Sequence, residues 1–192
     1  MVERVRAAEM AQAPGFTGLA EAVARAYHKL LAYKDEYEVA RLYTDGRFAK
    51  QIAGQFEGRF KLLYNLAPPL IATRDPVTGH LKKRIFGPWM GLAFRVMAKF
   101  KGLRGTALDV FGYTTERRME RRLISEYEDI IERLLATLDG DKHALAIEIA
   151  KLPLEMRGFG HIKHANVARA KKEEARLMVL FERSAMHVAA AE

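Results

Sequence analysis

Residues 115–138 read TERRMERRLISEYEDIIERLLATL, and this stretch marks the chain as mainly helical. Its apolar residues recur at every third or fourth position, which is the spacing of one buried helix face. Thr114 or Thr115 can cap the start of the helix, and Gly140 can end it. We predict a long amphipathic helix whose buried stripe consists of Met119, Leu123, Ile124, Tyr127, Ile130, Ile131, Leu134, Leu135 and Leu138.

Helical patterns also occupy much of the remaining chain. Residues 17–43 predict one long helix with Thr17 as its N-cap, and this helix would place Tyr33 and Tyr37 one turn apart. Trp89 begins another apolar face, and we interpret it as a core anchor. Further helices are predicted over residues 3–13, 48–56, 88–100, 141–149 and 162–181.

The pattern changes near residue 60. Residues 60–66 alternate apolar and polar side chains, which is typical of a strand with one buried face. A second extended piece spans residues 70–74, the sequence DPVTG at 75–79 is a turn signal, and residues 81–86 form the returning arm. These segments predict an antiparallel hairpin.

The predicted fold class is therefore α+β and mainly helical, with about five to seven helices and a small antiparallel β-hairpin near residues 60–86. At 192 residues the chain has the size of one domain, which we predict to span residues 1–192. Within it, residues 1–15 form a flexible N-terminal segment or a short helix, and residues 182–192 form a frayed tail.

Composition excludes several classes of site. The chain contains no cysteine, so it can hold no disulfide, no thiolate-ligated iron–sulfur cluster and no cysteine-ligated zinc. Its start lacks the apolar block of a signal peptide, and no stretch approaches the roughly 20 apolar residues that cross a bilayer. We expect a soluble, cytoplasmic protein without a membrane partner.

The net charge of +8 is unevenly distributed. No acidic residue lies between Asp75 and Asp109, whereas this segment contains Lys82, Lys83, Arg84, Arg95, Lys99, Lys101 and Arg104. Clustered cations create a positive potential that attracts phosphates, acidic protein surfaces or nucleic acids.

The sequence RGFGHIK at residues 157–163 lies between two helical patterns and is followed by Asn166. Its glycines allow a tight turn, and a helix starting near Ile162 would direct free N–H groups at an anion. The candidate ligand or anion contacts are Arg157, His161, Lys163 and, in the glycine-punctuated segment 101–114, Arg104. The alternative is a helix connector whose glycines serve only the turn and whose cations face water.

Catalytic patterns are sparse. The glycine spacing in residues 101–114 matches neither a dinucleotide fingerprint nor a Walker loop. His161 and His164 are three apart but have no acidic third ligand close in sequence, and no Gly-x-Ser-x-Gly elbow is present. We expect no catalytic residue and no metal site in this chain.

Several separated motifs occur in the same order as in one known family. Together they resemble the C-terminal domain of the large fused indolepyruvate ferredoxin oxidoreductases, over residues from about 20 to 181. The motifs are YKDEYEVARLY at 33–43, LAPP at 66–69, KRxFGPW at 83–89, LRGTxLDxFG at 103–112, ERR at 116–118 and RGFGHIK at 157–163.

This resemblance implies an enzyme that oxidatively decarboxylates aryl-2-oxoacids to acyl-CoA and passes electrons to ferredoxin. Thiamine diphosphate, magnesium, iron–sulfur clusters and coenzyme A are then expected on the complete enzyme, and none within this chain. The cluster cysteines are absent, and the thiamine signature is not met, since Gly140-Asp141 continues with Lys142 in place of the second glycine. The resemblance implies a non-catalytic accessory domain, inactive in isolation, whose partners are the catalytic domains or subunits.

Two alternatives belong to other classes. One is a structural protein-interaction module whose basic surface meets an acidic neighbour. The other is a basic nucleic-acid-binding domain, motivated by the acid-free segment, although the chain contains no recognisable reading motif.

Overall fold

The computed structural model describes residues 1–33, 35–68, 73, 82–158 and 160–189, with side chains in the last helix up to residue 183. The chain divides into two compact units, Met1–Tyr33 with Met119–Glu192 (unit 1) and Lys34–Arg118 (unit 2). The described residues form eight α-helices and a two-stranded antiparallel sheet. The predicted mainly helical α+β class is confirmed, with one helix more than the upper end of the prediction.

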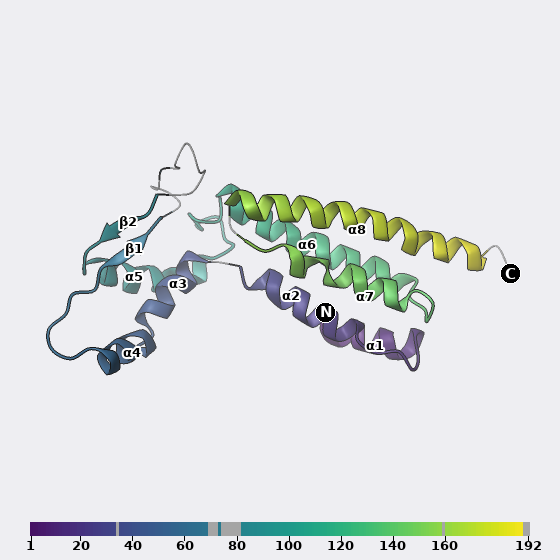
Figure 1. Ribbon diagram of the computed structural model, residues 1–192, viewed down its shortest axis with the longest axis horizontal. Coiled ribbons are helices and arrows are strands. Elements are labelled where there is room, and N and C mark those ends of the chain that lie inside the picture. The colour runs from purple at the N-terminus through teal and green to yellow at the C-terminus, as the bar shows by residue number, and fades with distance from the viewer. Residues whose placement is uncertain (34, 69–72, 74–81, 159, 190–192) are drawn as a thin grey trace. The chain divides into compact units, whose positions relative to one another are not determined.

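The described residues of unit 1 form helices and the loops that connect them. Its elements are α1 (Val2–Gln12), α2 (Leu19–Leu31), most of α6 (Thr115–Ala136), α7 (His143–Lys151), the 3-10 helix η2 (Leu152–Glu155) and α8 (Gly160–Ala189). Figure 1 shows α6, α7 and α8 side by side, and α2 contacts both α1 and α7. The boundary between the units falls inside α6.

The core of unit 1 is organised around α6, as the sequence pattern predicts. Eight residues of the predicted stripe are buried, and Ile124 packs partly buried against them. Thr114 Oγ1 accepts a hydrogen bond from the backbone N–H of Arg117 at 3.3 Å, which confirms Thr114 as the cap. Side chains from α2, α7 and α8, among them Val23, Ile149 and Phe181, complete the core. Each such apolar side chain contributes about 1.5–3 kcal/mol through burial.

The predicted cap of α2 is wrong. Gly18, and not Thr17, is the N-cap residue, and it supplies no side-chain cap. The carboxylate of Glu9 on α1 takes this role, because its Oε1 and Oε2 accept the backbone N–H groups of Leu19 and Ala20 at 2.7 and 3.0 Å. The same carboxylate lies 2.7 Å from Nε2 of His143, at the start of α7.

Unit 2 combines short helices with the sheet. Its elements are α3 (Glu36–Thr44), α4 (Arg47–Gln55), β1 (Tyr64–Leu66), β2 (Arg84–Phe86), α5 (Met90–Lys99) and the 3-10 helix η1 (Phe100–Leu103). The strands pair antiparallel with Asn65 opposite Ile85, and Lys82 N donates to Thr73 O at 2.8 Å. The predicted turn at residues 75–79 lies outside the described residues, as does the extended piece 70–74 except Thr73.

The prediction of one helix over residues 17–43 is wrong. The chain leaves the helical conformation after Leu31 and starts α3 at Glu36, so Tyr33 and Tyr37 do not share a helix. The reason is local: Asp35 has an extended backbone, and its Oδ1 accepts the N–H groups of Tyr37 and Glu38 at 2.8 and 3.4 Å. Such a side chain favours the start of a new helix over continuation of the old one.

An aromatic cluster forms the core of unit 2. Tyr43 of α3 stacks on Phe94 of α5 with ring centroids 5.0 Å apart, and Tyr64 of β1 meets both rings edge-on. Trp89 does not belong to this core, because 60% of its surface is exposed, so its interpretation as a core anchor is wrong. Within the described residues, no helix combines the length and the apolar character needed to cross a membrane.

Candidate functional site: a cationic bend in unit 1

The motif at residues 157–163 forms a sharp bend between η2 and α8. Gly158 and Gly160 have positive φ angles of 100° and 54°, a region that favours glycine. A Cβ atom at position 158 would also lie 2.8 Å from Cγ2 of Ile162. Gly158 is therefore required both for its backbone conformation and for the close approach of the first turn of α8.

The carbonyl groups of the bend are satisfied by side chains. Lys29 Nζ, reaching from α2, donates to the carbonyls of Pro153 and Met156, the latter at 2.7 Å. Arg157 Nε donates to Leu154 O at 2.8 Å, and Asn166 Nδ2 donates to Arg157 O at 2.9 Å. Since the last carbonyls of a helical segment lack partners within it, these four donations are the main polar support of the bend.

Lys163 ties the bend to α6. Its Nζ lies 2.5 Å from Oε1 of Glu120, and the two side chains are 17% and 9% exposed. Loss of one partner would leave the other charge in a largely dry site, which is costly. The pair therefore fixes the first turn of α8 against α6.

Three cations surround this point. Burial lowers the pKa of Lys29 to about 8, and the positive charges of Lys163 and Arg157 act in the same direction, while Glu120 opposes them. Burial and two neighbouring cations thus outweigh the single carboxylate that favours the charged form of Lys29.

The predicted contacts are only partly brought together. Arg157 and Lys163 both lie near Lys29, and His161 is exposed on the first turn of α8. Arg104 lies in unit 2, where its Nε is 3.1 Å from Oδ2 of Asp35. Sequence reasoning missed Lys29, because nothing in its helical pattern indicates a contact with carbonyls more than 120 residues away.

The depressed pKa of Lys29 can be tested directly. In a ¹³Cε titration by NMR, the Lys29 resonance should have its midpoint near pH 8. Between this value and the ordinary lysine pKa, the unfolded chain still holds a proton that the folded chain has released from Lys29. The free energy of unfolding should therefore increase as the pH rises through that window. A midpoint at the ordinary lysine value would contradict the described environment of Lys29.

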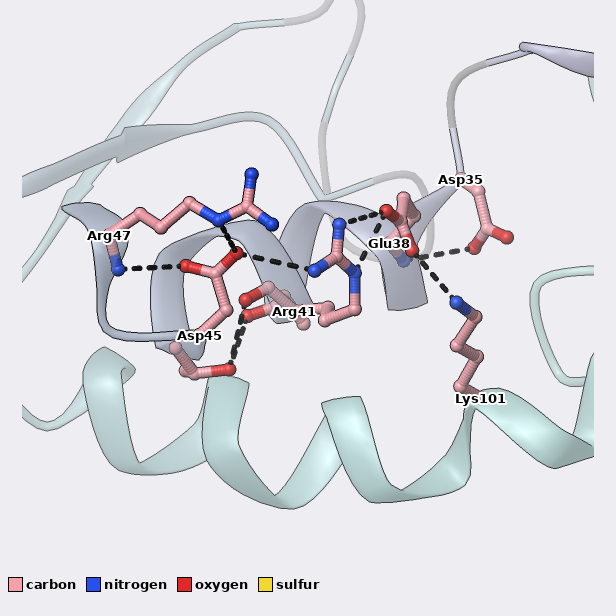
Figure 2. A network of polar contacts seen from close by, with 8 residues as sticks. Asp35, Glu38, Arg41, Asp45, Arg47 and Lys101 are labelled. Atoms are coloured by element: carbon pink, nitrogen blue, oxygen red, sulfur yellow. Dashed lines mark hydrogen bonds and ion pairs between the residues drawn. The ribbon is translucent and has the colours of Figure 1, made fainter.

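Unit 2 contains a second polar cluster, along α3. Figure 2 shows ion pairs that run from Lys101 through Glu38, Arg41 and Asp45 to Arg47. A hydrogen bond from Arg41 lowers the pKa of Glu38 to about 2, and Lys101 adds to this effect. Exposed networks of this kind contribute little to stability but fix the orientation of side chains.

The glycine-punctuated segment 101–114 is held against the start of α3. Asp109 is buried, and its two carboxylate oxygens accept the N–H groups of Gly105 and Gly112 at 2.9 and 3.0 Å. Glu36 receives two hydrogen bonds from Arg117, at 2.9 and 3.3 Å. Arg104 contacts Asp35 Oδ2 without the geometry of a hydrogen bond. Arg104 is therefore engaged in a structural ion pair.

Comparisons with known proteins identify one relationship. Searches among curated proteins and among solved structures found no match. The sequence model of DUF6537, described as a family of unknown function, matches residues 1–176. The chain belongs to the DUF6537 family.

Proposed function

We propose that this chain is a non-catalytic C-terminal accessory domain of an indolepyruvate/2-oxoacid:ferredoxin oxidoreductase. The complete enzyme would be cytoplasmic and would convert aryl-2-oxoacids to acyl-CoA, with thiamine diphosphate, magnesium, iron–sulfur clusters and coenzyme A on its other domains. The observation that carries the proposal is the ordered set of motifs between residues 33 and 163. Their number and order are more specific than any single motif among them.

The contacts of the motif residues support an accessory role. In unit 2, three residues of the first motif contact residues of later motifs. Asp35 pairs with Arg104, and Glu36 pairs with Arg117. Tyr37 forms a side-chain hydrogen bond with Asp109. In unit 1, Arg157 and Lys163 support the bend before α8. Motif residues that hold segments of the chain together are expected in a domain that is built to present surfaces to other domains.

Two roles of the cationic bend can be separated within this function. Arg157, His161 and Lys163 could contact a substrate carboxylate or a coenzyme A phosphate, or they could brace the fold. The hydrogen bonds from Lys29, Arg157 and Asn166 to backbone carbonyls favour the brace, because they engage these donors with the backbone of the bend itself. We therefore propose that this chain binds the catalytic domains, and that those domains carry out the reaction.

The accessory role predicts how activity divides between separate polypeptides. The purified chain should not reduce ferredoxin with indolepyruvate, thiamine diphosphate, magnesium and coenzyme A. The catalytic portion of the oxidoreductase, produced without this domain, should bind the separate chain in size-exclusion chromatography and gain activity or stability from it. The proposal would be contradicted if the chain alone showed turnover. It would also be contradicted if the catalytic portion neither bound the separate chain nor gained activity or stability from it.

The brace predicts the effect of Arg157→Ala in the complete enzyme. The KM values for the 2-oxoacid and for coenzyme A should each change by less than about twofold, because no ground-state contact with either molecule is lost. Arg169→Ala, which removes an exposed arginine of α8, is the matched control. A rise in one KM with Arg157→Ala alone would instead assign Arg157 to the ligand.

A further inference from the structure

Helix α5 presents an apolar stripe to solvent. Trp89, Leu92, Val96 and Phe100 are 60, 62, 51 and 50% exposed, and they recur at three- and four-residue spacing. The opposite side of the same helix is buried, with Met90 and Phe94 packed in the core of unit 2. Helix α5 is therefore apolar on two sides, and the described residues of unit 2 bury only one of them.

The exposed apolar stripe of α5 forms a shallow groove. Its four exposed residues, together with Ala93 and Met97, line this groove, which has a volume of about 530 Å³. Almost all of the groove surface is apolar, because none of these six side chains carries a charge. Grooves of this kind accept the apolar ridge of another helix, whose side chains recur at the same spacing.

A basic edge borders the groove. Each residue advances a helix by about 100°, which places Arg95 and Lys99 next to each other along one side of the stripe. Both side chains are exposed, and within the described residues neither has an acidic partner. The chain has no acidic residue from 76 to 108, so α5 itself supplies no carboxylate to these two cations.

We infer that the groove of α5 docks an amphipathic helix of a partner protein, with apolar residues at three- and four-residue spacing and Asp or Glu along one edge. The apolar ridge covers Trp89, Leu92, Val96 and Phe100, and the acidic edge pairs with Arg95 and Lys99. A second copy of this chain fits less well, because the same face would bring cations and no carboxylates. This surface does not depend on the oxidoreductase assignment, although it would suit docking to a catalytic domain.

Trp89 provides the readout, since it is the single tryptophan of the chain and lies in the groove. The probes are two synthetic helical peptides with the same leucine ridge, one with glutamate and one with lysine along the edge. The full chain should bind the glutamate peptide at least about tenfold more tightly, with a blue shift of Trp89 emission. Added salt should reduce this preference.

Substitutions on the exposed side of α5 test the same surface without touching the core. Val96→Asp should weaken binding of the glutamate peptide by about tenfold or more. The double variant Arg95→Glu with Lys99→Glu should reverse the preference between the peptides. Ala53→Asp, on the exposed surface of α4, is the control and should change neither affinity. Far-UV circular dichroism checks that every variant is folded.

The identity of the occupant is tested in the native host. A photo-cross-linking residue at Val96 should capture a peptide whose sequence is helical, amphipathic and acidic, and the same residue at Ala53 should not. Equal binding of both synthetic peptides would overturn the inference. Cross-links from Val96 to a second copy of the chain, or to another part of the same chain, would also overturn it. The same holds if Trp89 emission shifts to the blue with phosphatidylcholine–phosphatidylglycerol vesicles at protein concentrations too low for the glutamate peptide to bind.

Discussion

Replacing Glu9 by alanine should lower the free energy of unfolding by about 3–5 kcal/mol, as expected when one partner of a buried polar pair is removed. Glu9 is 5% exposed and accepts the N–H groups of Leu19 and Ala20, while its Oε1 lies 2.7 Å from His143 Nε2. Alanine would leave all three groups without an acceptor at a junction of α1, α2 and α7. Urea unfolding followed by circular dichroism measures the loss.

Two further substitutions serve as comparisons for Glu9→Ala. Glu9→Gln keeps one acceptor oxygen in place, so its loss should fall between that of alanine and the wild-type value. Glu3→Ala, on the same helix, removes an exposed ion pair with Arg6 and should cost less than about 1 kcal/mol. Amide hydrogen exchange at Leu19 and Ala20 should accelerate in Glu9→Ala but not in Glu3→Ala. Equal losses for the two alanine variants would refute the cap.

The contribution of Glu9 should depend on pH in a defined direction. Burial alone would raise the pKa of this carboxyl, but hydrogen bonds from His143 and from the N–H groups of Ala20 and Leu19 outweigh it and lower the pKa. A lowered pKa in the folded state adds stability above the ordinary glutamate value, and this stability is lost as the pH falls through the folded value. The difference between wild type and Glu9→Gln should therefore shrink on acidification below about pH 4.5.

Local patterns with many repeats could be read from the sequence. The stripe of α6 repeats over six turns, so a few misassigned residues could not change its interpretation. The strands of the hairpin were similarly indicated by alternation and by a strong turn signal. The break before α3 was missed because the apolar spacing continues through residues 32–35, although Asp35 followed by two glutamates in the first turn is a start signal.

Long-range partners could not be read in this way. Glu9 and His143 are 134 residues apart, and Lys29 reaches carbonyls at 153 and 156, so neither contact leaves a local pattern. Periodicity also shows that a helix has an apolar face but not what covers it. For this reason α5 was correctly predicted as a helix, whereas Trp89 was wrongly assigned to the core.

The same distinction applies to the candidate site. The glycines of RGFGHIK predicted a tight bend, which the positive φ angles at Gly158 and Gly160 confirm. Whether its cations bind an anion depends on where their donors point, and this depends on Lys29 and on carbonyls that only the fold brings together. Arg104 illustrates the point, because its ion pair with Asp35 joins two motifs about seventy residues apart in the sequence.

Asp109→Ala should lower the free energy of unfolding of unit 2 by about 2–3 kcal/mol, because it removes the acceptor of several donors at once. The carboxylate of Asp109 accepts the N–H groups of Gly105 and Gly112, and burial together with the charge and hydrogen bond of Asp109 raises the pKa of Tyr37. Gly112 and Tyr37 are buried, so water cannot replace the lost acceptor there.

A double-mutant cycle isolates the Tyr37 contact. Tyr37→Phe removes only the hydroxyl, so it should cost less than Asp109→Ala, and the two losses should not add, because they share one hydrogen bond. Glu57→Ala, an exposed position in the same unit, should change stability by less than about 0.5 kcal/mol. Hydrogen exchange at Gly112 reports directly on the loop. If Asp109→Ala costs no more than Glu57→Ala, segment 101–114 is not held by Asp109, and the LRGTxLDxFG motif must owe its composition to a contact outside this chain.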